Sequence, residues 1–143
     1  MSETPKPPTW FWIVSGVSLV WNLLGLLAFI SQMTMSPEAL AALPEAERTF
    51  YETVPAWATV AFAIAVFGGT LGCVALLLRK AWAEILFVLS LLGVLTQNIN
   101  SFLLSDALSI YGPTVAVMQA MVIAICVFLI WLARSSKARG WIA

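Results

Sequence analysis

The chain has 143 residues, of which 62% are hydrophobic and 10% are charged, and its formal net charge is zero. This composition excludes a water-soluble globular protein, because so few charged side chains cannot cover a surface that faces water on all sides. The length allows four membrane spans of about 22 residues and short connections, which leaves no room for a separate soluble domain. We therefore predict a single membrane domain over residues 1–143.

Four stretches of the chain lack charged residues, approximately 10–31, 53–78, 85–105 and 107–133. Each is long enough to cross the ~30 Å hydrocarbon core of a bilayer, which takes about 20 helical residues. With boundaries placed at turn residues, the predicted spans are about 10–32, 55–78, 82–104 and 113–133. Short turns at 79–81 and 112–113 would make consecutive spans antiparallel neighbours. The predicted fold is an all-α, integral membrane four-helix bundle built from two antiparallel transmembrane hairpins.

Basic residues predict the orientation of the bundle. Six of them fall on one side of the predicted spans: Lys6, Arg79, Lys80, Arg134, Lys137 and Arg139. Because Lys and Arg accumulate in short cytoplasmic loops, both termini should be cytoplasmic. Four glutamates of the first loop and Asp106 of the third would then face outward. We expect Glu84 to pair with Arg79 or Lys80, and Trp141 to lie at the lipid interface beside the basic tail.

The first outer loop, residues 33–54, has its own helix signals. Ser36-Pro37-Glu38 has the pattern of an N-cap, a proline at the first helical position and an acid in the first turn. Pro44 should interrupt this helix, and a second short helix should start after it. We predict a short interfacial helical segment that either caps the outer end of the bundle or acts as a lid or a docking surface for a partner.

The second span carries small residues on one face. Small side chains at four-residue spacing let another helix approach closely. The predicted packing residues are Ala61, Ala65, Gly68, Gly69 and Gly72. The sequence leaves open whether the approaching helix belongs to this chain or to a second copy.

Amide side chains within the spans are the candidate site, since a polar group in hydrocarbon needs a partner or water. At about 1.5 Å of rise per residue, Asn22 lies ~18 Å from the cytoplasmic boundary, Gln97 ~22 Å and Gln119 ~21 Å. Asn100 shares the helical face of Gln97, whereas Asn98 points elsewhere and would contact a neighbour. The amides form either an interhelical hydrogen-bond cluster or the lining of a solute pocket.

Several chemistries lack their residues. The chain contains no histidine, which removes histidine-based metal ligation, haem ligation and Ser-His or Cys-His catalysis. Cys73 and Cys126 do not form a CxxC pair, and we expect them to be free thiols. We predict no enzymatic activity, no cofactor and no metal site.

Several short segments carry a resemblance to a known group: Trp21-Asn22 with Gly25, Pro55-Ala56-Trp57, Phe67-Gly68-Gly69, Leu71-Gly72-Cys73 and Arg79-Lys80-Ala81-Trp82. They resemble a group of small four-helix bacterial inner-membrane proteins that automated naming often labels sugar transporters. The resemblance spans most of the chain. It implies a bacterial inner membrane and favours a solute carrier, but it transfers no binding residue to this sequence.

Two functional hypotheses follow. The first is a small carrier or facilitator for a neutral polar solute such as a sugar, with Asn22, Gln97, Asn100 and Gln119 at its site. The second is a non-catalytic structural or accessory subunit that binds a larger membrane complex through the small-residue face and the acidic outer loop. The expected partners are membrane lipid and either further copies of the chain or another membrane protein, and no nucleic acid.

Overall fold

The computed structural model describes residues 6–104, 109–110 and 112–143, and Asp106 lies outside them. Over these residues the chain is helical and contains no strand. The elements in chain order are α1 (Thr9–Met33), α2 (Pro37–Ala41), α3 (Glu45–Glu52), α4 (Ala56–Leu77), α5 (Ala83–Asn98), the π-helix η1 (Ile99–Leu104) and α7 (Pro113–Ala138).

Four helical segments of the described chain are long and apolar enough to cross a membrane: Thr9–Met33, Ala56–Leu77, Ala83–Leu103 and Pro113–Ala138. The prediction of an all-helical chain with four such helices is confirmed. The last helix extends five residues beyond the predicted boundary at 133. Lys137 lies in its final turn, where a cation interacts favourably with the negative end of the helix dipole.

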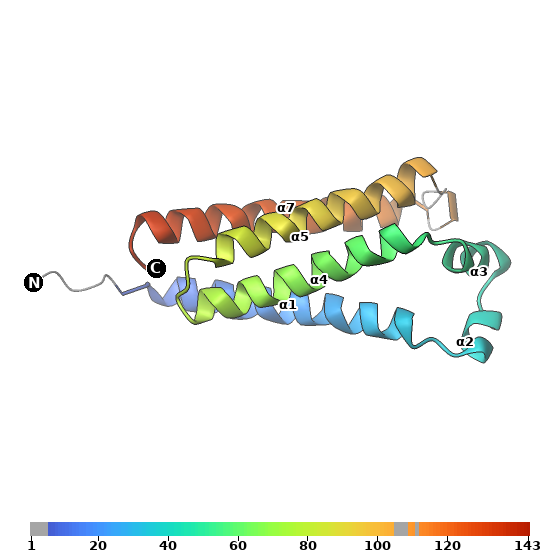
Figure 1. Ribbon diagram of the computed structural model, residues 1–143, viewed down its shortest axis with the longest axis horizontal. Helices are drawn as coiled ribbons and strands as arrows, with labels where there is room; N and C mark the ends of the chain where they lie inside the picture. Colours follow the sequence, from blue (N-terminus) through green and yellow to red (C-terminus); the bar gives the residue numbers. More distant parts are fainter. Residues whose placement is uncertain (1–5, 105–108, 111) are drawn as a thin grey trace, which may run out of the picture.

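The long helices alternate in direction, and α1 begins at the same end at which α7 ends, opposite α2 and α3 (Figure 1). The most extensive contact joins α4 and α5, followed by the contacts of α1 with α4 and of α5 with α7. By contrast, α1 and α7 are not in extensive contact with each other. The two central helices are therefore α4 and α5, and a space can exist between the outer two.

Small residues explain why α4 and α5 lie so close. A Cβ atom at Gly68 would lie 3.0 Å from the Leu86 carbonyl oxygen, and one at Gly93 would lie 2.6 Å from the Ala61 carbonyl oxygen. The Ser90 hydroxyl crosses this interface and donates a 2.6 Å hydrogen bond to the Ala65 carbonyl. Since the two backbones nearly touch, a side chain larger than hydrogen at either glycine would push the helices apart.

The contact between α1 and α4 uses the same small-residue face. A Cβ atom at Gly69 would collide with the Asn22 side-chain oxygen, and the Thr70 hydroxyl donates a 3.4 Å hydrogen bond to the Asn22 carbonyl. All five predicted packing residues of α4 are buried: Ala61, Ala65, Gly68, Gly69 and Gly72. The helices that approach this face are thus α1 and α5 of the same chain.

The hydrophobic core lies at the end of the bundle where α7 ends. It combines Phe11, Leu76, Phe87 and Leu132 with Ile142, a residue beyond the last helix. The chain turns back after α7 at Gly140, which adopts a positive φ of 76°. The C-terminal residues consequently close this end of the bundle.

Two contacts fix this C-terminal closure to the turn between α4 and α5. Arg79 adopts a left-handed φ of 58°, its Nε donates to the Trp141 carbonyl at 2.8 Å, and its own carbonyl accepts from the Ala143 N–H at 3.1 Å. The Trp141 ring packs edge-on against Trp10 and Phe11, with centroid distances of 5.5 and 5.9 Å. Trp141 is buried, so the expectation that it lies at the lipid interface is wrong. Packing against two aromatic rings outweighs interfacial placement here.

Glu84 also differs from expectation. Its carboxylate lies 3.3 Å from Nε of Arg134 on α7, whereas we expected Arg79 or Lys80. Arg79 is not available to Glu84 in the same way, because its guanidinium Nε donates to the Trp141 carbonyl of the C-terminal segment. Since the Arg134 side chain is 71% exposed, this ion pair adds little stability.

The predicted outer loop, residues 33–54 and called the outer segment below, forms two short helices that Pro44 separates, as the sequence predicts. The Ser36 hydroxyl accepts the Ala39 N–H at 3.1 Å, as the capping pattern predicted, and α3 starts directly after Pro44. Both helices lack buried residues, and they lie at the end of the bundle away from the core (Figure 1).

Candidate functional site

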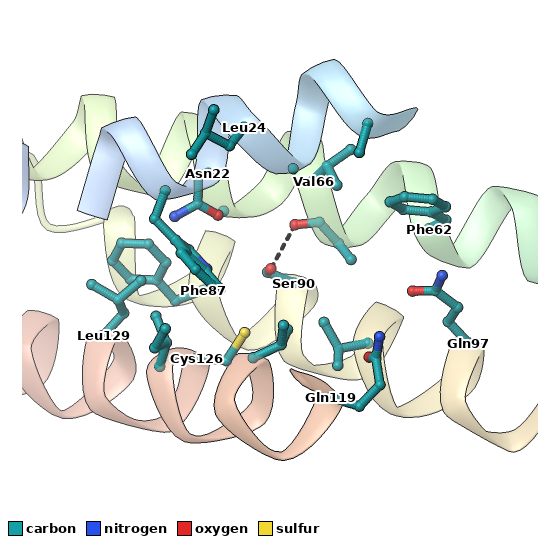
Figure 2. Close-up of a pocket in the computed structure, with 18 of the residues that line it drawn as sticks. Asn22, Leu24, Phe62, Val66, Phe87, Ser90, Gln97, Gln119, Cys126 and Leu129 are labelled. Atoms are coloured by element: carbon teal, nitrogen blue, oxygen red, sulfur yellow. Dashed lines mark hydrogen bonds between the residues drawn. The ribbon is translucent and has the colours of Figure 1, made fainter. Parts of the chain in front are cut away.

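A cavity of about 380 Å³ lies among α1, α4, α5 and α7 (Figure 2). Its lining contains no charged residue. Most of the wall is apolar and aromatic, and a few polar side chains interrupt it, which is the usual composition of a site for a small molecule. The polar lining residues are Asn22, Ser90, Gln97 and Gln119, together with the thiol of Cys126.

Three of the four amides singled out from the sequence therefore line one cavity, each from a different helix. In Figure 2, Gln97 and Gln119 extend from α5 and α7 at one end of the cavity, and Asn22 extends from α1 farther along it. Their positions in the sequence predict nearly the same depth in the bilayer, and the tertiary structure brings the three residues to a common cavity.

Asn100 does not line this cavity. It is buried and lines a smaller cavity of about 40 Å³ beneath the outer segment, together with Phe50 and Val54. Asn100 lies three residues beyond Gln97, ~4.5 Å farther along the helix axis, and Gln97 lines the small cavity as well. Both residues therefore face the small cavity, and Asn100 lies beyond the end of the large one.

The Asn22 amide is already hydrogen-bonded within the protein. Its Nδ2 donates to the Ser18 carbonyl at 2.8 Å and to the Cys73 sulfur at 3.4 Å. Both of its N–H groups thus have partners, one on its own helix and one on α4. Asn22 links α1 to α4, and its capacity to donate to a ligand is small.

Gln97 and Gln119 differ from Asn22, because neither side chain has a hydrogen-bond partner among the described residues. Both are partly buried within the apolar bundle. A primary amide offers two donor hydrogens and an acceptor oxygen, and leaving these unpaired away from water is costly. The two glutamines therefore favour an occupant that forms hydrogen bonds, either water or a ligand.

Polarity changes along the cavity. Phe87 and Leu129 line the end opposite the two glutamines (Figure 2). Each lies ten residues from the glutamine of its own helix, a distance of ~15 Å along the axis. The cavity is thus elongated, with amides at the end near α2 and α3 and apolar side chains at the end near the hydrophobic core.

The two ends of the cavity are bounded differently. At the end near α2 and α3, Phe62 and Gln97 line both the large cavity and the small one, so they separate two adjoining spaces. At the other end, Phe87 and Leu129 belong to the hydrophobic core that Ile142 completes. Packed side chains therefore close this second end.

The side of the cavity between α1 and α7 is more open. Leu24 of α1 is 59% exposed and Met118 of α7 is 45% exposed, although both line the cavity. In a membrane these exposed surfaces would contact lipid chains. The cavity thus borders the region that lipid would occupy.

Sequence reasoning did not identify the apolar part of this site. Trp21, Phe62 and Phe87 line the cavity, but an aromatic residue within an apolar span carries no signal that distinguishes a cavity wall from a core or lipid contact. Asn98, which we expected to contact a neighbour, has both amide atoms buried and unpaired in the described structure.

These features define a helical membrane protein with an uncharged internal cavity. Comparison of the chain with models of protein families, with curated proteins and with solved structures found no match in any of the three searches. Within the described residues, no group of three or more His, Cys, Asp and Glu side chains is arranged to hold a metal ion.

Proposed function

We propose that the protein is a small, non-catalytic carrier or facilitator for a neutral polar solute. The observation that carries this proposal is the pair of unpaired amides, Gln97 and Gln119, which face one cavity from two helices. In an apolar environment their hydrogen-bonding groups favour a neutral ligand with hydroxyl, carbonyl or amide groups. A charged ligand is disfavoured, because no charged side chain lines the cavity to balance it.

The proposed path starts at the outer side. A solute would pass from the small cavity beneath α3 to the large one by displacing Phe62 and Gln97, which separate the two. Exit toward the other side would require rearrangement of the core around Phe87 and Ile142. A protein that is closed at one end in this way is suited to alternating access, in which one barrier opens at a time.

We further propose that the helices form two antiparallel hairpins in a bacterial inner membrane, with both termini cytoplasmic. The distribution of basic residues supports this orientation. The resemblance to small bacterial inner-membrane proteins supports the location. Four helices provide little protein on either side of a path, so we propose that the functional unit contains several copies of the chain.

The test is a thermal-stability screen of the purified protein against sugars, polyols and other neutral solutes. A ligand that binds the folded state raises the melting temperature by mass action. We expect one solute class to stabilise the wild type and to lose this effect in Gln97→Leu and Gln119→Leu. Thr96→Val is the matched control, since Thr96 is exposed, neighbours Gln97 and bonds only to the Leu92 carbonyl of its own helix.

If no neutral solute of any class, polar or amphiphilic, stabilises the protein, or if the stabilisation persists in both glutamine variants, the carrier proposal fails. The accessory-subunit alternative would then be favoured. It now rests on the exposed acidic outer segment, because α1 and α5 of the same chain occupy the small-residue face of α4.

A further inference from the structure

We propose that the ligand of the large cavity is a neutral single-chain amphiphile that enters from the bilayer between α1 and α7, its polar head at Gln97 and Gln119 and its apolar chain toward Phe87 and Leu129. This inference rests on the proposed function, specifies the ligand as an amphiphile rather than a sugar, and replaces entry past Phe62 by lateral entry from the bilayer. Three observations carry it: the polarity gradient along the cavity, the missing charges and the lateral opening.

The polarity gradient restricts the ligand first. A sugar has hydroxyl groups all around its ring, and a buried hydroxyl without a hydrogen bond is unfavourable. In this cavity the unpaired amides gather at one end, while Asn22 and Ser90 already donate to protein atoms. A ligand with its hydrogen-bonding groups at one end and a hydrocarbon chain at the other matches this distribution (Figure 2).

The lining determines the charge of the head group. No lysine, arginine, aspartate or glutamate lines the cavity. A carboxylate, phosphate or ammonium would leave the charged surface of the membrane without gaining a counter-charge, which is strongly unfavourable. A hydroxyl, ester or amide head loses less solvation, and both glutamines offer donors and acceptors to it.

The lateral opening determines the route. Leu24 and Met118 line the cavity and are also exposed on the surface that would contact lipid. A hydrocarbon chain that moves from the bilayer into an apolar cavity exchanges one apolar environment for another, so its transfer carries little penalty. The hydrogen bonds at the glutamines then supply the preference for the cavity over the surrounding lipid.

The experiment uses the full chain in lipid nanodiscs and a monoacylglycerol with a photoreactive diazirine near the end of its acyl chain. After illumination, mass spectrometry locates the labelled residues. We expect labelling near Phe87 and Leu129 that an excess of unlabelled monoacylglycerol suppresses. A fatty acid of the same chain length should compete much less, because its carboxylate has no counter-charge in the cavity.

The glutamine variants test recognition of the head group. In Gln97→Leu and Gln119→Leu, the competitor should lose potency roughly three- to thirty-fold, the loss that corresponds to one hydrogen bond in a membrane protein. Thr96→Val should leave the potency unchanged. Undiminished potency in both glutamine variants would overturn the inference.

The distribution of the label gives a second criterion. Val17 and Val127 are exposed on α1 and α7 and do not line the cavity. Labelling of these residues to the same extent as the cavity residues, with no effect of the competitor, would mean that the probe only samples bulk lipid, and the inference would be wrong.

Failure of this inference and failure of the proposed function give different results. If sugars or polyols stabilise the protein through Gln97 and Gln119 while the monoacylglycerol does not label the cavity, the carrier proposal stands and the amphiphile inference is overturned. If neither ligand class depends on the glutamines, both proposals are overturned.

Discussion

Replacement of Gly93 by alanine should weaken the contact between α4 and α5 by an amount that the structure allows us to work out. The added Cβ would lie 2.6 Å from the Ala61 carbonyl oxygen and 2.9 Å from the Ala65 backbone nitrogen. Ordinary contacts of this kind begin at 3.4 Å, so the helices must separate locally by about 0.8 Å. Both contact atoms belong to the backbone of α4, so no side-chain rotation can relieve the clash.

Three contributions determine the expected change in the free energy of unfolding. Overpacking of a close contact destabilises by about 1 to 3 kcal/mol. Separation of the helices also weakens the hydrogen bond from Ser90 to the Ala65 carbonyl, and such bonds contribute ~0.6 to 1.7 kcal/mol in membrane proteins. The higher helix propensity of alanine returns up to ~1 kcal/mol. We expect a net loss of about 2 kcal/mol.

The assay is unfolding in mixed micelles as the fraction of denaturing detergent increases, followed by circular dichroism. Gly25→Ala is the matched control, because a Cβ there would meet only Val66 Cγ1 at 3.6 Å, an ordinary contact. This control should be as stable as the wild type or slightly more stable. If Gly93→Ala and Gly25→Ala unfold at the same detergent fraction, the close packing of α4 on α5 described above is incorrect.

Three further predictions concern other parts of the bundle. Trp141→Ala should lower the free energy of unfolding by about 3 kcal/mol, because the ring is buried. Trp131→Ala is the control, since Trp131 is exposed. Equal losses in the two variants would contradict the packing of the C-terminal residues onto the bundle. Asn22→Leu should destabilise by about 1 to 3 kcal/mol, because it removes two hydrogen bonds. Gln119→Leu should leave stability unchanged or raise it, because it removes an unpaired amide from an apolar environment. Detergent unfolding measures both, and the reverse order would argue against their different roles. Glu84→Gln should cost less than ~1 kcal/mol, since its arginine partner is largely exposed; a larger loss in the same assay would reveal a stronger pair.

Several features of the fold could be predicted because they depend on local sequence. Within a bilayer each backbone N–H and C=O must be satisfied inside its own segment, so a long apolar run is almost always a helix. The Ser36 cap and the restart of the chain after Pro44 are likewise local, since their partners lie within three or four residues. These features require no knowledge of distant parts of the chain.

The candidate site could be predicted only in part. Helical periodicity and depth placed Asn22, Gln97 and Gln119 at one level of the membrane, and the structure shows that all three line the same cavity. The pattern gave no reason to separate Asn100 from them, because Asn100 and Gln97 both face the small cavity and only the tertiary structure shows where the large cavity ends. Nor did it distinguish the bonded Asn22 amide from the unpaired glutamines, since the sulfur of Cys73 lies 51 residues away in the chain.

By itself, the sequence determined that the helices suit a lipid environment, how many helices are long enough to cross a membrane, and which face of α4 carries small residues. Hydropathy and side-chain size determine these features, and both are properties of each segment alone. Tertiary structure alone decided which helices meet that face, where α1 and α7 leave a cavity, and that Trp141 folds back onto Trp10. The physical reason is that helix association in a bilayer depends on complementary packing and on hydrogen bonds between distant segments. Hydrophobicity does not distinguish one apolar partner from another or from lipid.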